Sequence, residues 1–160
     1  MCELEQYKVG IADYKITEAP NSLITIGLGS CVGVALFNPK KKTGSLLHVM
    51  LPDSTGFSDT SKWPKFADLA IPRVVDEMSG DPSDLVAKIA GGASLFNFSS
   101  QNKSLQIGKR NIEMVRKQLE ELNIPILGEH IGGNSGRTMK VDLENFDVAV
   151  RLVNREIYRI

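Results

Sequence analysis

The sequence predicts a layered α+β domain with largely antiparallel strands and two or three helices. The first third of the chain contains several short apolar runs of strand length with no helical stretch between them. Consecutive strands without intervening helices argue against a doubly wound parallel sheet. A chain of 160 residues, 42% of them hydrophobic and 24% charged, can bury a core without disulfides or metal, so we expect one domain over residues 1–160.

The strand predictions depend on partial alternation of apolar and polar residues and on runs of β-branched and aliphatic residues. A polar segment from Pro39 to Gly44 separates two of these runs and favours a hairpin connection, which would make the two strands antiparallel neighbours. About seven or eight strands are expected, in segments 7–17, 22–28, 32–37, 45–51, 85–92, 124–134, 136–143 and 146–153.

Two segments have the apolar periodicity of amphipathic helices. The first extends over residues 61–79, where Pro72 either kinks the helix or lies in the first turn of a second one. The second extends over residues 107–122 and has the clearest apolar stripe in the chain.

Composition argues against nucleic acid or an anionic membrane as the main partner, although a local basic patch stays open. Nineteen basic and nineteen acidic side chains give a formal net charge of zero, whereas proteins that bind nucleic acid or anionic membranes usually carry a basic excess. The N-terminal residues lack the apolar region of a signal peptide, and no apolar run has the length of a membrane span. We therefore expect a cytoplasmic protein with reduced thiols, and the two cysteines and two histidines show no paired metal-ligand spacing.

The segment GLGSCVGV, residues 27–34, surrounds one cysteine with glycines. It is neither a dinucleotide loop, since Val32 takes the place of the last glycine, nor a nucleophile elbow, since no helical pattern follows. Cys31 is then either a small buried hydrophobe or a nucleophile. Gly27 and Gly29 favour the nucleophile, because glycines within a strand often mark a bulge or a close backbone approach, and bare N–H groups can hold an oxyanion.

A thiol nucleophile requires a base, and the chain contains two histidines. The predicted hairpin places His48 within a few positions of Cys31, although an apolar setting is also typical of a core histidine bound to a carbonyl. His130 adjoins a glycine pair and is expected in an exposed loop. Thr25 has the strand parity of Cys31, so it could accept the second N–H of the histidine, or it could be only a β-branched strand former.

Five motifs, TIGLGSCVGV, HVMLPDS, KIAGGAS followed by F, IGKRN and GGNSGR, follow one another in the order seen in the CheD family, and the resemblance covers residues 7–145. The chain thus resembles the chemoreceptor glutamine deamidases. The resemblance implies a protein-glutamine glutaminase that converts glutamines of methyl-accepting chemoreceptors to glutamates. It also implies a β-sandwich-based fold like that of a deamidating toxin, no metal or organic cofactor, and a CheC-type phosphatase as protein partner.

The same resemblance assigns the catalytic cysteine to Cys31, the histidine to His48 and the supporting threonine to Thr25. Backbone N–H groups from Gly29 through Ser30 to Cys31 are expected to hold the oxyanion.

Relatives are expected to carry an acidic residue at the position of His130, which argues against that histidine as the base. In the loop at 93–104, Phe96 and Phe98 are candidate contacts for the receptor or for CheC, or they pack on the core. Two alternatives stay open: a non-catalytic module that regulates a CheC-type phosphatase, and a cysteine hydrolase that cleaves another bond, such as a receptor methyl ester or a small amide.

Overall fold

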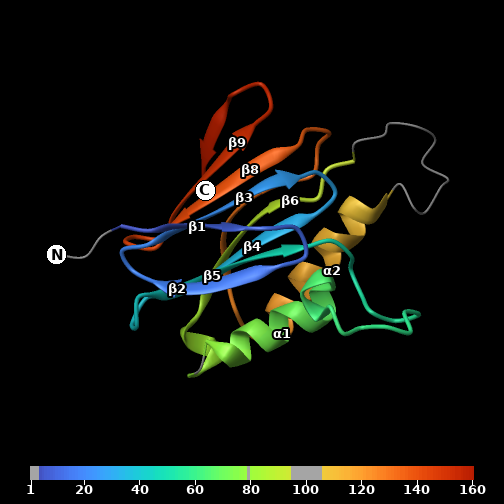
Figure 1. The fold of residues 1–160 in the computed structure, drawn as a ribbon, viewed down its shortest axis with the longest axis horizontal. Coiled ribbons are helices and arrows are strands. Elements are labelled where there is room, and N and C mark those ends of the chain that lie inside the picture. The colour runs from blue at the N-terminus through green and yellow to red at the C-terminus, as the bar shows by residue number, and fades with distance from the viewer. Residues whose placement is uncertain (1–3, 79, 95–105) are drawn as a thin grey trace.

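The computed structural model describes residues 4–78, 80–94 and 106–160, and shows two five-stranded sheets packed face to face, with two α-helices beside them (Figure 1). The first sheet has the order β1 (Gln6–Val9), β3 (Ser22–Leu28), β8 (Arg137–Asp142), β9 (Asp147–Leu152) and β10 (Ile157–Arg159). The second has the order β2 (Tyr14–Glu18), β5 (Thr43–Val49), β4 (Val32–Asn38), β6 (Val86–Gly91) and β7 (Ile126–Ile131). The predicted α+β class is confirmed.

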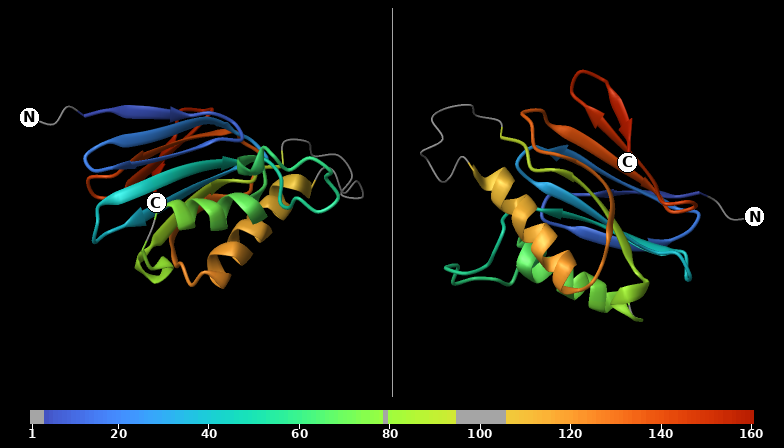
Figure 2. Two further views of the ribbon diagram at one scale, coloured as in Figure 1. Left: turned by 60° about the horizontal axis from the view of Figure 1, so that its bottom comes forward. Right: turned by 180° about the vertical axis from the view of Figure 1, so that it is seen from behind.

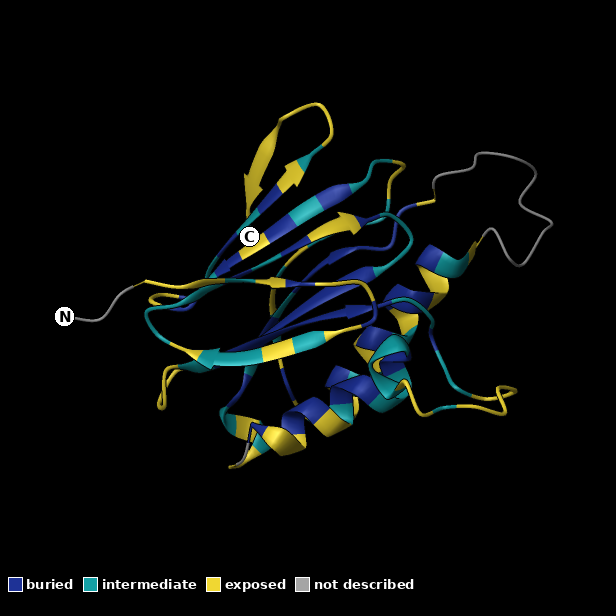
Figure 3. Ribbon diagram, viewed as in Figure 1, coloured by how far each residue is buried: buried dark blue, intermediate teal, exposed yellow. Residues whose placement is uncertain are grey.

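Both helices, α1 (Ala67–Glu77) and α2 (Ile107–Glu121), cover the outer face of the second sheet (Figure 2). The second sheet is consequently buried on both faces: one apolar cluster lies between it and the helices, and another lies between the two sheets. Every residue of β4 is buried, which explains why its sequence is a continuous apolar run instead of an alternation. In Figure 3 the buried residues are concentrated along the central strands of the second sheet. No helix in the described part of the chain is long and apolar enough to span a membrane.

The sheets are largely antiparallel, as predicted, but β1 pairs with β3 and β6 pairs with β7 in parallel. The expected strand at 7–17 is in fact two strands in different sheets, since the chain turns between Val9 and Tyr14, where Ala12 has a φ of 61°. Strand β10 was not expected from the sequence; it is a short edge strand whose residues are all exposed. Because none of its residues is buried, its sequence has no alternation of apolar and polar residues by which a strand could be predicted.

The first helix also differs from expectation. Residues Trp63–Lys65 form a short 3-10 helix, η1, and the α-helix begins at Ala67. Helix α1 continues through Pro72, so no second helix starts there. Proline has no N–H to donate to the carbonyl four residues earlier; the four buried aliphatic and alanine side chains around it hold the helix on the sheet: Ala70, Ile71, Val74 and Val75. A second 3-10 helix, η2 (Pro82–Asp84), precedes β6.

Candidate functional site

The hairpin of β4 and β5 brings the cysteine and the first histidine to one end of the second sheet. Gly33 pairs with His48 and Val32 pairs with Val49, so Cys31, which directly precedes β4, lies at the level of the residue after β5. Side chains two apart on a strand share a face. Cys31 packs on the cluster between the sheets, on the face to which Gly33 and its partner His48 belong. The predicted hairpin and its approximate register are confirmed.

Gly33 lets the two sheets approach closely at this point. A Cβ added there would lie 2.7 Å from the Met139 Sδ and 3.1 Å from the Leu28 Cδ1, both of the first sheet. Met139 pairs with Thr25 on β3. The missing side chain therefore leaves room for a polar contact between a threonine of one sheet and a histidine of the other.

That contact is a hydrogen bond between the Thr25 Oγ1 and the His48 Nδ1, 2.7 Å long and fully buried. The same hydroxyl donates its proton to the Val9 carbonyl oxygen at 2.8 Å. A hydroxyl has one proton, so Thr25 must accept from the ring, and the Nδ1 carries the hydrogen. The chain of bonds thus fixes the neutral tautomer of His48 whose Nε2 has a free lone pair.

The Nε2 of His48 is buried and has no hydrogen-bond partner in residues 4–78, 80–94 and 106–160. Burial lowers the pKa of the imidazole to about 4, because the low-dielectric interior disfavours the charged ring. At neutral pH His48 is therefore an uncharged base. Its accepting nitrogen has no partner; such an unpaired buried atom lowers the stability of the fold and is typical of a residue in a functional site.

Cys31 is half-buried, and its thiol has a raised pKa because burial disfavours the thiolate; the Cys31 backbone N–H opposes this shift. No hydrogen bond joins its sulfur to His48 among the described residues. The site therefore brings Thr25 and His48 into direct contact, and places Cys31 on the same face as a neutral thiol. A neutral thiol beside a neutral imidazole can react by general-base catalysis, in which the proton moves as the sulfur attacks.

The backbone before Cys31 is bent, as the glycines indicated. Gly27 has a φ of 81°, and the pairing of β3 with β8 shifts register between Thr25 and Leu28. The Gly29 N–H donates to the Gly27 carbonyl at 3.1 Å, so that amide is already engaged. Of the proposed oxyanion donors, the amides of Ser30 and Cys31 have no backbone acceptor within the described ranges.

His130 does not lie in an exposed loop, as expected from its neighbours; it is a half-buried residue of β7. Its Nδ1 accepts a hydrogen bond from the Arg137 Nε at 2.9 Å, and its ring packs on Tyr158 with centroids 4.6 Å apart. Burial and the guanidinium charge lower its pKa. Strand β6 lies between β7 and β4, and among the described residues no hydrogen bond joins His130 to Cys31, His48 or Thr25.

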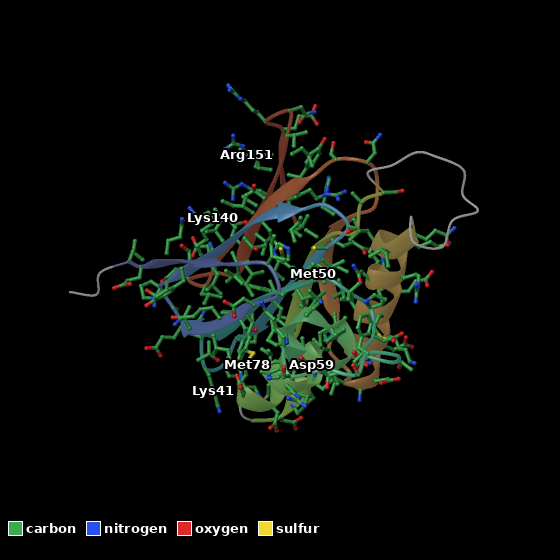
Figure 4. The ribbon with its side chains drawn as sticks, turned by 45° about the vertical axis from the view of Figure 1, so that its right-hand side comes forward. Lys41, Met50, Asp59, Met78, Lys140 and Arg151 are labelled. Carbon is green, nitrogen blue, oxygen red and sulfur yellow. The ribbon has the colours of Figure 1, made fainter. Side chains whose placement is uncertain are left out.

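Three further points concern the surroundings of the site. Phe96 and Phe98, the candidate partner contacts, lie outside the described residues. Asn111 of α2, which the sequence analysis did not single out, is buried and donates to the carbonyl oxygens of Ser30 and Met50 (Met50 is labelled in Figure 4). The feature of the sequence that could have indicated Asn111 is a polar residue on the apolar face of the predicted helix, within the IGKRN motif. Among the described residues no three His, Cys, Asp or Glu side chains form a metal-binding group.

Comparison with known proteins identifies the family. The family model for CheD, described as chemotactic sensory transduction, matches residues 50–152. A protein of Desulforamulus reducens named probable chemoreceptor glutamine deamidase CheD is 51% identical over 151 residues, which cover 92% of this chain and 91% of the relative. Proteins of the same name from Clostridium tetani and Clostridium acetobutylicum are 49% and 48% identical, over 94% and 98% of this chain and 93% and 96% of their own lengths.

One similar solved structure overlaps with this one only in part. The Bacillus licheniformis hypothetical protein YfiH superposes with a TM-score of 0.46 at 18% identity, over 74% of this chain and 49% of that chain. The sequence relatives are therefore the informative matches. Because about half of its residues are identical to theirs along nearly its whole length, this chain belongs to the CheD family.

Proposed function

We propose that this protein is a chemoreceptor glutamine deamidase, in which Cys31 is the nucleophile, His48 the general base and acid, and Thr25 the residue that holds the ring. The substrate class comes from the names of the relatives, which are probable chemoreceptor glutamine deamidases. The observation that carries the chemistry is the Thr25–His48 hydrogen bond, which leaves the buried Nε2 of His48 as a free lone pair.

In the first half of the reaction, the Cys31 sulfur attacks the carboxamide carbon of a receptor glutamine while its proton moves to the His48 Nε2. The C–S bond forms as the C=O becomes a tetrahedral oxyanion, which the backbone amides of Ser30 and Cys31 hold by hydrogen bonds. The imidazolium then returns its proton to the amide nitrogen. The C–N bond breaks, ammonia leaves, and a thioester joins the glutamyl side chain to Cys31.

In the second half, water replaces ammonia. His48 takes a proton from the water as its oxygen attacks the thioester carbonyl, and then gives the proton to the departing Cys31 sulfur. The product is a glutamate side chain, and the enzyme returns to its neutral state. Thr25 keeps the Nδ1 protonated throughout, because its own proton is committed to the Val9 carbonyl. Each turnover adds a negative charge to a receptor helix and creates a site that can be methylated.

Two finer points belong to the same proposal. The protein acts in the cytoplasm on the cytoplasmic helices of methyl-accepting chemoreceptors, and a CheC-type phosphatase is its protein partner in chemotaxis. Both points rest on the family resemblance. The alternative of a non-catalytic module that only regulates such a phosphatase leaves the buried Nε2 of His48 without a role. That unpaired nitrogen favours the enzyme.

The deciding experiment incubates a chemoreceptor cytoplasmic fragment with the protein and follows the intact mass of the fragment together with ammonia release. Wild-type protein should give the mass gain that replaces NH2 by OH at each site, and Cys31→Ala should give none while keeping its fold. The second cysteine supplies a matched control, since Cys2→Ser should deamidate at the wild-type rate. Deamidation by Cys31→Ala would overturn the assignment of the nucleophile. No mass change with any variant on an authentic receptor would favour the non-catalytic module.

A further inference from the structure

Helix α2 begins against the backbone of Gly92 and Ala93, which lie beside the cysteine segment, because two glycines remove the intervening side chains. A Cβ on Gly108 would lie 2.4 Å from the Ala93 carbonyl oxygen, and one on Gly92 would lie 2.3 Å from the Ile112 Cδ1. Both residues belong to motifs, KIAGG and IGKRN, that the proposed reaction does not use. Their consequence is close contact between the first turn of α2 and the chain beside Cys31.

Asn111 lies one turn into that helix, on the same face as Gly108, and is completely buried. Its Nδ2 donates to two backbone carbonyl oxygens, those of Ser30 and Met50, each at 2.9 Å. Ser30 is the residue before the proposed nucleophile, and Met50 is two residues beyond the proposed base. One carboxamide therefore joins the segment that carries Cys31 to the end of the strand that carries His48.

All three carbonyl groups around the cysteine are held in this way. The Gly29 oxygen accepts from the Ala93 N–H at 2.8 Å, the Ser30 oxygen accepts from Asn111, and the Cys31 oxygen accepts from the Gly92 N–H at 2.9 Å. In a planar trans peptide the C=O and the following N–H point in opposite directions. Fixing the Ser30 carbonyl on Asn111 consequently directs the Cys31 N–H away from α2, and it also polarises that N–H as a donor.

The remaining atom of the carboxamide indicates that packing alone does not explain Asn111. Its Oδ1 is buried without a hydrogen-bond partner in the described part of the chain. Asparagine is also a weaker helix former than leucine or alanine. A buried asparagine with an unpaired oxygen is unfavourable for stability, so its two donated bonds are the feature that distinguishes it from an aliphatic residue at the same place.

We propose that Asn111 is a positioning residue for the deamidation: it orients the Ser30–Cys31 peptide so that the Cys31 amide can receive the oxyanion, and it fixes the nucleophile segment against the end of β5. Asn111 touches neither the substrate nor the sulfur in this scheme; it acts through the backbone. The inference rests on the proposed function, since it assigns a role within that reaction.

The test separates acyl transfer, which forms an oxyanion, from alkylation, which does not. In a full-length Cys2→Ser background, Cys31 is acylated with p-nitrophenyl acetate and, separately, alkylated with iodoacetamide. Asn111→Asp has nearly the same size and loses both donated bonds. We expect it to slow acylation by about tenfold or more, while alkylation changes by less than about threefold. Outright removal of an oxyanion donor costs about 10²–10³, and here the Cys31 N–H is misoriented but not removed. Asn111→Ala gives the same comparison without the added carboxylate, in case Asn111→Asp does not fold.

Leu119→Ala is the matched control, because this buried residue of α2 has no bond to the cysteine segment and its truncation loosens the same helix. At a temperature where thermal unfolding shows it folded, it should acylate at the wild-type rate. Equal loss of acylation and alkylation in the Asn111 variants, wild-type rates in both, or the same selective loss in Leu119→Ala would each overturn the proposal. Both rates are measured without a receptor, so a wild-type protein that fails to deamidate receptors would contradict the proposed function and still leave this test readable.

Discussion

The two histidines of the chain are placed in opposite hydrogen-bonding situations. His48 donates from its Nδ1 to Thr25, which cannot donate back because its proton is held by the Val9 carbonyl. His130 accepts at its Nδ1 from the Arg137 guanidinium, so its Nδ1 lone pair is occupied and a neutral ring carries its hydrogen on the Nε2. The first ring keeps a free basic nitrogen in the core; the second has none.

The comparison shows that burial alone does not distinguish His48, the proposed base, from His130, which is bonded to Arg137. The pKa of both rings is lowered, chiefly by burial. What differs is the group that meets the Nδ1. A hydroxyl with a committed proton makes the ring a donor at that nitrogen, and a guanidinium makes it an acceptor. Each of the following predictions changes one member of this comparison.

The largest expected effect is on turnover. His48→Ala should lower the rate of receptor deamidation by on the order of 10²–10⁴, because the reaction loses its general base and acid. His130→Ala should stay within about threefold of wild type, since its ring is bonded to Arg137 and strand β6 separates its strand from the one that follows Cys31. Initial rates of ammonia release measure both variants. Comparable losses in the two would remove the distinction between the rings.

The second expected effect is on stability at acid pH. The pKa of His48 is about 4 in the fold against an ordinary value of 6.5. Between these values the unfolded chain binds a proton that the folded chain does not. The contribution of His48 to the free energy of unfolding is therefore fully present above pH 6.5 and is lost as the pH falls to 4. The loss from this group is about 3 kcal/mol.

Urea unfolding at pH 7.5, 5.5 and 4.5 measures the decline, and His48→Gln should remove most of it. Glutamine fills the same site and can still donate to Thr25. The carboxylates titrate in both proteins, so the difference between the two curves reports His48. If the free energy of unfolding of the two proteins fell equally with pH, His48 would not be kept neutral by burial.

The smallest expected effect comes from the threonine. Thr25→Val keeps the shape and removes the hydroxyl, so the ring loses the acceptor that sets its tautomer. Hydrogen-bond partners that orient a metal-bound histidine are worth about 10–100-fold in activity, and we expect a fall in kcat of similar size when the His48 ring loses its partner. Thr25→Ser, which restores a hydroxyl, should recover most of the activity. A Thr25→Val protein with wild-type kcat would show that the tautomer is fixed without Thr25.

The sequence was most informative where structure depends on nearby residues. The segment predicted as a strand at 22–28 is β3 with the same bounds, and the hairpin register that relates Cys31 to His48 followed from the position of one polar turn. It was least informative at 7–17, where a turn divides a predicted strand between two sheets, and at β10, whose exposed residues carry no burial pattern. Pro72 was misleading because packing on the sheet maintains a helix that local propensity would interrupt.

The amino-acid sequence by itself determined the α+β class, the hairpin that aligns the cysteine with the first histidine, and, through its motifs, the resemblance to CheD. These features depend on periodicity, turn residues and motif order, which are local properties of a chain. The tertiary structure alone decided three contacts. Thr25 of one sheet bonds to His48 of the other, Arg137 donates a hydrogen bond to the Nδ1 of His130, and Asn111 donates to the carbonyl of the peptide before Cys31. Each joins residues from separate elements, and only packing of the sheets and helices fixes their distances.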